Sequence, residues 1–263
     1  MFTKHKLFQG AMILTAAGFI TRFMGFFFRI FLSHAFGEEN VGLYQLVFPV
    51  YALCISLSTS GIQTALSRMV AGKVSLGRQN EAKSILYTAL SLTLLLSFTE
   101  VIFVQQNALF IAETFLGDAR CQELLVIISY ALPCAAVHSC ICGYSFGLQK
   151  ASLPAISQLI EQTLRILFVI CLFFFMKQSG RVPSIQIAAA GIVVGEFASA
   201  LFSSRFLSKQ GSSSQRPVLP SLTKNLRELL SLSIPLTANR TAVTLVQSVE
   251  AASIPACLKL SGM

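Results

Sequence analysis

Long apolar segments separated by short polar ones dominate the pattern of this chain. A helix needs roughly 20 mostly apolar residues to cross a bilayer. Seven segments reach that length, at residues 7–35, 41–66, 82–104, 124–144, 153–176, 185–207 and 229–258. The pattern therefore predicts an all-α, polytopic membrane protein whose spanning helices are joined by short loops.

A few positions interrupt this pattern. Pro49 and Pro133 lie inside the second and fourth apolar segments and predict kinks there, because proline lacks the N–H that continues a helix. Residues 209–220, KQGSSSQRPVLP, predict a flexible linker from their Ser, Gly and Pro content. The amphipathic stretch 222–230 that follows is expected to lie along the membrane surface.

The composition supports a membrane protein and excludes a soluble domain. Hydrophobic residues make up 54% of the chain and charged residues 12%, with a mean hydropathy of +0.70. Soluble domains carry about 25% charged residues. The net charge of +9 does not predict a nucleic-acid partner, because the basic residues are spread over short loops. Membrane lipids are the expected surroundings.

The distribution of Lys and Arg predicts the orientation. Twelve of the 20 basic residues lie in segments on the same side of the membrane as the N-terminus, and four lie on the opposite side. The remaining four lie inside the spans. Because positive loops stay in the cytoplasm, we expect a multi-pass protein of the cytoplasmic membrane with a cytoplasmic N-terminus. The first apolar segment resembles a signal peptide at its start but has no cleavage site, so we expect it to be retained as a helix.

Two arginines inside the first apolar segment are the most unusual feature. A charge at the centre of a spanning helix costs at least ~2.5–3.5 kcal/mol. Arg22 and Arg29 are seven residues apart and share a helical face with Gly18 and Gly25. Both side chains could reach the membrane surface or pair with carboxylates. Arg22 lies near mid-span, where the first explanation is weak, and we interpret it as a substrate-binding residue.

Two further spans contain arginine. Glu161 and Arg165 are four residues apart in the fifth apolar segment, with Gln158 one turn earlier. They either form an ion pair that fixes helix packing, or Glu161 orients Arg165 toward a cavity. In the seventh segment Pro235 loosens the backbone, and polar side chains gather around one face: Arg240, Thr244 and Gln247, with Asn239 and Glu250 to one side. The three helices together predict an anion-binding interior.

Other polar residues give weaker signals. Glu196 in the sixth segment is interpreted as either a proton site or an arginine partner. His138 is more typical of a packed polar residue than of a proton relay. The seven cysteines show no metal-ligand spacing, and no nucleotide-binding loop, zinc-protease motif or nucleophile elbow occurs. We therefore predict no metal, no cofactor and no enzymatic activity.

Several runs resemble the stage V sporulation protein B family of flippases, in order along the chain. The matching runs are RFMGFFFRIFLSHAFGEENVGLYQLVFPVYALCISLSTSGIQTALSRMVA, GYSFGLQKASLPAISQ, SQLIEQTLRI and SIPLTANRTAVTLVQSVEAASIP. This family belongs to the multidrug/oligosaccharidyl-lipid/polysaccharide flippase superfamily. The resemblance implies export of a lipid-linked saccharide whose polyprenyl-diphosphate group crosses a cationic cavity between two six-helix lobes, by alternating access.

The resemblance also bears on single residues. First-helix arginines are shared with lipid II flippases, where they are implicated in diphosphate recognition. Arg22 matches such a position directly, whereas Arg29 is one residue out of register. The second-helix arginine of the lipid II flippases has no counterpart here, because residues 50–58, VYALCISLS, are uncharged. This departure argues more against lipid II as the substrate than against a flippase in general.

The chain contains about half the helices of this family. We therefore expect a six-helix lobe at residues 1–207, a linker and interfacial segment at 208–228, and the first helix of a truncated second lobe at 229–263. A second lobe or a second copy of the chain would then be a partner. The alternatives are a cation-coupled multidrug exporter of the same superfamily, a non-transporting membrane scaffold, and a glycosyl-transferring membrane enzyme, for which the loops lack paired acids.

Overall fold

The chain is a bundle of membrane-length helices in a computed structural model that describes residues 2–210 and 222–260, with side chains described for residues 8–208 and 224–247. Along the described chain the elements are α1 (Phe2–Phe36), α2 (Glu38–Ile55), the π-helical stretch η1 (Ser56–Ser60), α3 (Gly61–Ser75), α4 (Gln79–Gln106), α5 (Ala108–Thr114), α6 (Cys121–Ser129), α7 (Ala131–Gly147), α8 (Ser152–Gln178), α9 (Gln186–Gln210) and α10 (Leu222–Leu260).

The spans match the seven predicted segments. Six helices of the described chain are long and apolar enough to cross a membrane, and the pair α6 and α7 forms a seventh span if its two parts are taken together. Most boundaries fall within a few residues of the prediction. The exception is the second span, which runs from Glu38 to Ser75 and continues well past the predicted end at residue 66.

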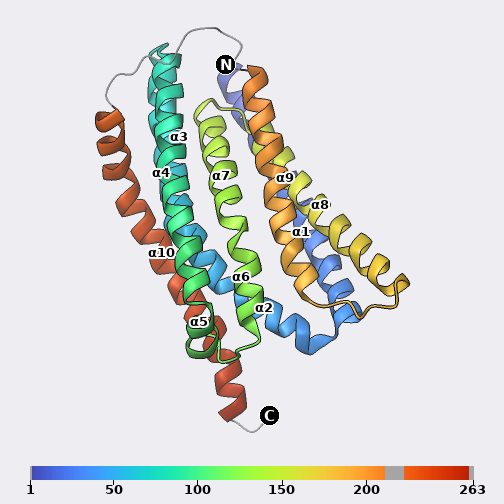
Figure 1. Cartoon of the computed structure of the whole chain (residues 1–263). Coiled ribbons are helices and arrows are strands. Elements are labelled where there is room, and N and C mark those ends of the chain that lie inside the picture. Colours follow the sequence, from blue (N-terminus) through green and yellow to red (C-terminus); the bar gives the residue numbers. More distant parts are fainter. Residues whose placement is uncertain (1, 211–221, 261–263) are drawn as a thin grey trace.

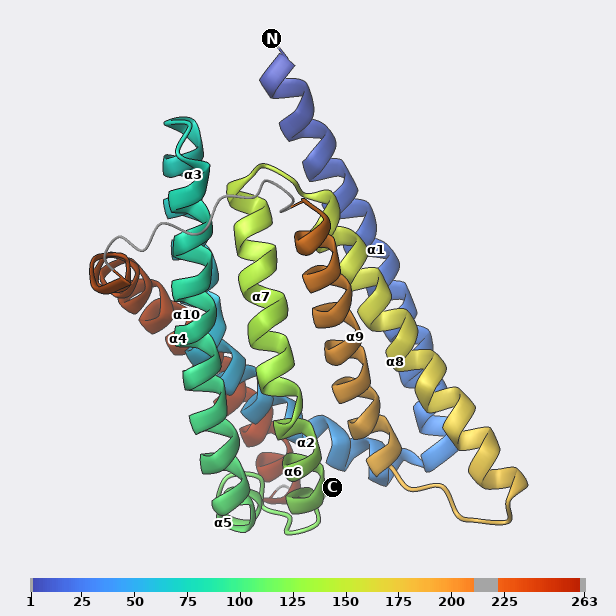
Figure 2. The ribbon, with the colours of Figure 1, turned by 45° about the horizontal axis from the view of Figure 1, so that its top comes forward.

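Two groups of helices stand on either side of α7. Figures 1 and 2 show α3 and α4 together on one side and α1 and α8 on the other, with α9 between α7 and α8. The helix α2 crosses below and packs against α1, α6, α7 and α10. The turn between α3 and α4 lies at the same end of the bundle as the start of α1 (Figure 1).

The second span changes its helical geometry in the middle. The π-helical stretch η1 joins α2 to α3 without a turn, seven residues after Pro49. Its hydroxyls bond back to carbonyls four residues earlier, Ser58 to Cys54 at 3.0 Å and Thr59 to Ile55 at 2.7 Å. Such back-bonding bends helices, and π segments occur frequently at functional sites.

The kink predicted at Pro133 is present, whereas Pro49 lies inside the continuous helix α2. The axes of α6 and α7 differ by 41°, with the break at Tyr130. Proline at position 133 cannot donate to the carbonyl of Ser129, four residues earlier, so the helix is interrupted on that side. The break turns α7 so that it packs against α3, α4 and α9.

Glycines allow the central helices to approach closely. A methyl group added at Gly147 of α7 would lie 2.6 Å from Cγ1 of Val70 and 2.9 Å from the carbonyl oxygen of Ser67, both on α3. One added at Gly143 would lie 2.8 Å from the carbonyl oxygen of Gln63. Small residues at such contacts are the usual means of packing helices in a membrane, where apolar burial gives no driving force.

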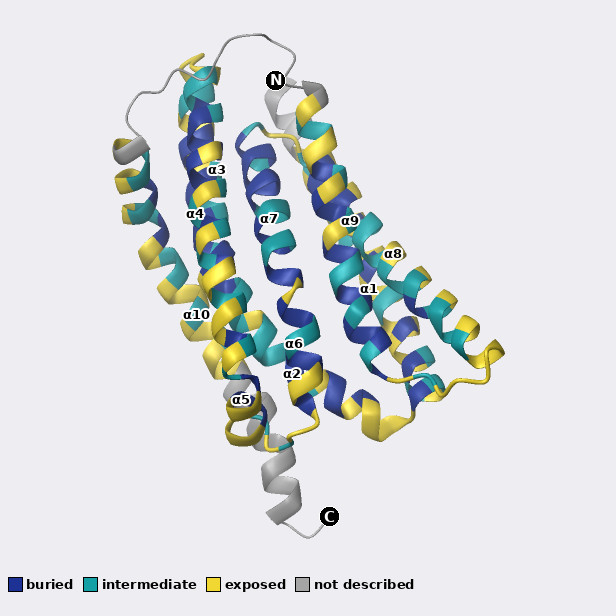
Figure 3. Ribbon diagram, in the orientation of Figure 1, coloured by how far each residue is buried: buried dark blue, intermediate teal, exposed yellow. Residues whose placement is uncertain are grey.

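The buried residues form two main clusters, and apolar side chains cover the outside. One cluster joins the end of α1 with α2, α6, α8 and α9, and the other joins α3, α4, α7 and α10. Figure 3 shows buried residues along α7 and exposed ones along the outer faces of α8 and α10. Large apolar side chains exposed on α1, including Phe19, Phe23 and Phe27, suit contact with lipid.

The seventh span packs on the lobe through α3. Leu229 and Ser233 of α10 are buried, and a methyl group at Gly61 of α3 would lie 2.7 Å from the carbonyl oxygen of Ser233. The amphipathic stretch from Leu222 and the apolar span form one continuous helix. Most of the linker at residues 209–220 lies outside the described residues.

Replacing Gly147 with alanine is expected to lower the thermal stability of the chain. The added methyl would overlap α3, and overpacking of this kind costs ~1–3 kcal/mol. Gly72→Ala on α3 is the matched control, because a methyl there meets nothing within 4 Å. Melting of both variants in detergent, followed by circular dichroism, measures the difference. Equal melting temperatures would contradict the close contact of α3 with α7.

Candidate functional site

A cluster of polar side chains from four spans lies at mid-depth in the lobe. The hydroxyl of Tyr51 on α2 donates to Oε1 of Glu196 on α9 at 3.2 Å. Oε2 of the same carboxylate lies 3.7 Å from Nδ1 of His138 on α7. Nε2 of His138 is 2.9 Å from the hydroxyl of Ser157 on α8. We call these residues, together with Glu161 and Arg165 of α8, the interior cluster.

The ion pair of α8 completes the interior cluster. Arg165 Nη2 donates to Oε1 of Glu161 at 2.7 Å, and each side chain is only 13% exposed. The ligand-type atoms of His138, Glu161 and Glu196 all lie within 4.8 Å of one another. The predicted ion pair is therefore present. The sequence did not predict that His138 and Glu196 lie beside this ion pair.

Two glycines of α9 bring Glu196 against this pair. A methyl group at Gly195 would lie 2.9 Å from the carbonyl oxygen of Glu161, and one at Gly191 would lie 2.5 Å from Cγ2 of Val169. The helices α8 and α9 thus touch along their backbones, which small residues allow. Because of this contact, the carboxylates of Glu161 and Glu196 come from adjacent helices into one space.

Polar atoms of the interior cluster remain without hydrogen bonds. Among the described residues, Oε2 of Glu196 and Nε of Arg165 are buried and have no partner within hydrogen-bond distance. An unpaired polar atom in a low-dielectric interior is costly and calls for an explanation. Both atoms have capacity for one further ligand, an acid proton or donor for Glu196 and an acceptor for Arg165.

Arg22 and Arg29 lie on a flank of α1. The buried stripe of this helix contains Ala17, Thr21 and Phe28, and the two arginines are exposed about a quarter of a turn away. The exposed phenylalanines occupy the next part of the surface. The arginines therefore stand between the lobe and the lipid-facing side. Neither makes an ion pair or a side-chain hydrogen bond with any described residue.

Arg29 and Arg165 lie on helices that pack against each other. The helix α1 packs against both α8 and α2. Arg29 is exposed on α1, whereas Arg165 belongs to the interior cluster on α8.

Arg240 lies on the same face of α10 as the residues that pack on the lobe, further along the helix. It follows the buried Ser233 by seven residues, yet it is exposed. At this level Thr241 lies 3.4 Å from the hydroxyl of Ser56 on η1. Thr244 bonds to the carbonyl of Arg240 at 2.9 Å. Other predicted site residues differ in placement: Asn239, Gln247 and Gln158 are exposed, and the side chain of Glu250 lies outside the described residues.

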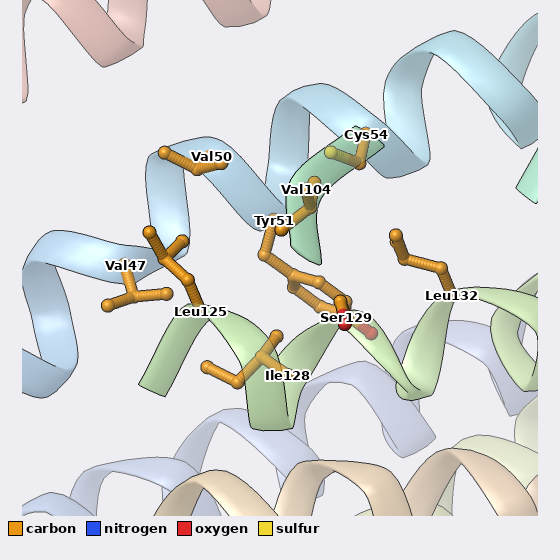
Figure 4. Close-up of a pocket in the computed structure, with 9 residues that line it drawn as sticks. All are labelled: Val47, Val50, Tyr51, Cys54, Val104, Leu125, Ile128, Ser129 and Leu132. Carbon is orange, nitrogen blue, oxygen red and sulfur yellow. The ribbon is translucent and has the colours of Figure 1, made fainter. Parts of the chain in front are cut away.

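Tyr51 also borders a small apolar hollow between α2, α4 and the two parts of the fourth span. Figure 4 shows nine residues around it, mostly aliphatic, among which Tyr51 and Ser129 carry hydroxyls. None of its lining residues is charged. The hollow is therefore not suited to bind an anion, and the predicted cationic interior is not this space.

Sequence comparison decides the family. The family model described as polysaccharide biosynthesis protein matches residues 7–258. The chain belongs to the polysaccharide biosynthesis protein family. This agrees with the resemblance to stage V sporulation protein B and with the prediction of a transport protein rather than an enzyme.

Two relatives in the family are full-length proteins of Bacillus subtilis. Stage V sporulation protein B is 33% identical over 246 residues, which cover 90% of this chain and 46% of that protein. The lipid II flippase MurJ is 26% identical over 203 residues, covering 73% of this chain and 37% of that protein. The family member described here therefore spans less than half the length of either relative.

The fold is that of transporters of the MOP superfamily. A multidrug resistance MATE family transporter in an outward-facing conformation has a TM-score of 0.77 at 17% identity, over 92% of this chain and 54% of that one. A MOP superfamily transporter from Pyrococcus furiosus has a TM-score of 0.74 at 18% identity, over 92% of this chain and 53% of that one. These similarities confirm the predicted lobe plus a seventh helix, and they concern the fold alone.

Removing one partner of the Glu161–Arg165 pair should destabilise the lobe more than removing both. Glu161→Gln or Arg165→Gln leaves a charge unpaired, which costs about 3–5 kcal/mol for a buried pair. The double variant removes both charges and should melt closer to the wild type. Circular dichroism melting in detergent of the four proteins gives the comparison.

Lys73→Gln is the control for this comparison of single and double variants. Lys73 pairs with Glu81 at 2.8 Å at the more exposed turn between α3 and α4, where loss of a partner should change stability little. If the double variant at positions 161 and 165 were as unstable as the sum of the single variants, the two side chains would not act as a pair.

Proposed function

We propose that this chain is one lobe, with the first helix of a second, of an exporter of lipid-linked saccharides in the cytoplasmic membrane. The main support for this proposal is that Arg22 and Arg29 are exposed within a spanning helix and have no partners among the described residues. A cationic side chain at this depth is costly unless it faces water or an anion.

The position of the arginines on α1 favours a cavity over the lipid. The apolar phenylalanines cover the side of α1 that suits lipid, and the arginines lie next to the stripe packed on the lobe. Such a flank borders the space between this lobe and a facing one. Two guanidinium groups seven residues apart would line that space along the direction of transport.

A diphosphate is the anion that suits such a surface. Guanidinium groups bind phosphate oxygens in pairs of parallel hydrogen bonds, which are short and strong where water is excluded. Arg165 would contribute its unpartnered Nε from the lobe side, and Arg240 would contribute from α10. The relative named lipid II flippase supports a lipid-linked saccharide as the substrate class.

The opposite wall of the cavity would come from a second lobe. The chain covers about half of its relatives, and α10 already packs on α3 where a second lobe would begin. Residues 1–207 would form the first lobe, 208–228 the connection and 229–263 the start of the second. Either a continuing polypeptide or a second copy of the chain supplies the remainder. The excess of basic residues at the end that holds the N-terminus supports its cytoplasmic location.

A cation-coupled multidrug exporter is the second candidate, because the interior cluster contains two carboxylates. These carboxylates are engaged by residues of the lobe itself, Glu161 by Arg165 and Glu196 by Tyr51. They are therefore less available to a drug cation than the arginines of α1 are to an anion.

Arg22→Gln should weaken binding of undecaprenyl diphosphate. Hydrogen bonds to charged groups contribute about 1.5–3 kcal/mol, so the loss should be tenfold or more in Kd. The affinity of the purified chain in nanodiscs can be measured by native mass spectrometry. Undecaprenol, which lacks the diphosphate, serves as the control ligand and should be unaffected by the substitution.

Arg181→Gln is the matched control variant, because Arg181 is exposed in the loop between α8 and α9 and outside the spans. Equal affinities of wild type and Arg22→Gln for the diphosphate would overturn the anion-binding flank. Binding of a cationic drug that requires Glu161 or Glu196 would favour the multidrug exporter instead.

A further inference from the structure

The hydrogen bonds around His138 determine which of its ring nitrogens carries a proton. The hydroxyl of Ser157 donates to the carbonyl of Pro154 at 3.0 Å. In the arrangement where this hydroxyl donates to Pro154, it accepts at its 2.9 Å contact with Nε2 of His138, and Nε2 then carries a hydrogen. A neutral His138 would then present the lone pair of Nδ1 to its other neighbour.

That neighbour is the unpartnered oxygen of Glu196. Oε2 lies 3.7 Å from Nδ1, and among the described residues it has no hydrogen bond. Oε1 already accepts from Tyr51. Two lone pairs facing each other in a buried site repel, whereas a proton between them makes the contact attractive. One proton and a shortening of this 3.7 Å contact would complete a hydrogen bond.

The charges of the interior cluster require the same proton. Glu161 and Glu196 carry two negative charges when ionised, and Arg165 supplies one positive charge. With His138 neutral the cluster has a net charge of −1, and one added proton makes it neutral. An uncompensated charge is expensive in the interior of a membrane protein. No further charged side chain is needed to close this balance.

The other elements packed around the pair add only weakly acidic groups. Tyr51 comes from α2, Cys134 and Cys142 from α7, and the sulfur of Cys142 lies 3.8 Å from Ser157. The side chains of His138 and Glu196 are 15% and 10% exposed, so the site is nearly but not completely closed.

We propose that His138 and Glu196 form a proton-exchange site, in which one proton is held between Nδ1 of His138 and Oε2 of Glu196. The proton comes from water and returns to water, and no other bond changes. When it leaves, the cluster regains a negative charge beside Arg165. A metal ion is the competing occupant of the same three ligand residues, but it would have to displace Arg165 from Glu161.

Nitrogen-15 NMR of the histidine-labelled chain in nanodiscs tests this site. His138→Gln assigns its signals among the three histidines of the chain. In the wild type we expect Nε2 to stay protonated while Nδ1 gains and loses its proton within a titration from about pH 5 to about pH 11, since a nearby carboxylate favours the protonated imidazole. Glu196→Gln should weaken proton binding at Nδ1 about tenfold, because the carboxylate is lost without a change in shape.

His34 is the internal control in the same spectra, since it is exposed at the end of α1 and should titrate identically in both proteins. The proposal is overturned if Nδ1 of wild-type His138 does not change its protonation in this range, or if Glu196→Gln leaves its titration unchanged. It is also overturned if addition of Na⁺, Mg²⁺ or Zn²⁺ shifts the His138 signals in the wild type but not in Glu196→Gln. Undecaprenyl diphosphate is not used, so the result is independent of the proposed transport function.

Discussion

The cost of placing charge in a low-dielectric interior is the constraint on which the structure depends. Each ionisable side chain in the spans must find a partner, water or a ligand. Glu161 and Arg165 meet this requirement within one helix turn. Glu196 meets it in part, because Oε1 accepts from Tyr51 while Oε2 has no hydrogen bond among the described residues. Arg22 and Arg29 do not meet it within the described chain. The lobe itself therefore stabilises the charges of the interior cluster, whereas the charges of Arg22 and Arg29 are exposed on its surface.

Close helix packing makes the compensation across helices feasible. Salt bridges and hydrogen bonds between spans require backbones to approach within the reach of short side chains, and Gly191 and Gly195 provide this between α8 and α9. The bend at Tyr130 directs α7 toward α9, so that His138 meets Glu196. The break before α7 and the glycine contacts between α8 and α9 thus serve the same end, because they gather α2, α7, α8 and α9 around the carboxylate of Glu196.

The sequence predicted most of the fold because spanning helices follow from local composition. The seven spans, the break near Pro133 and the Glu161–Arg165 pair depend on residues close together in the chain. The interior cluster does not. Tyr51, His138 and Ser157 come from three different spans, and His138 alone is indistinguishable from a packed polar residue. Only the approach of α7, α8 and α9 shows that Nδ1 faces a carboxylate oxygen. The exposure of Arg22 and Arg240 likewise depends on how α1 and α10 pack on the other helices, for which the sequence has no local pattern.

The interior cluster and the arginine flank are chemically opposite, and α8 connects them. Arg165 holds Glu161 beside His138 and Glu196, and α8 also packs against α1, the helix of Arg22 and Arg29. Its Nε has no partner among the described residues. A gain of negative charge in the interior cluster would strengthen the attraction between Arg165 and the surroundings of Glu161, because opposite charges interact strongly where water is excluded.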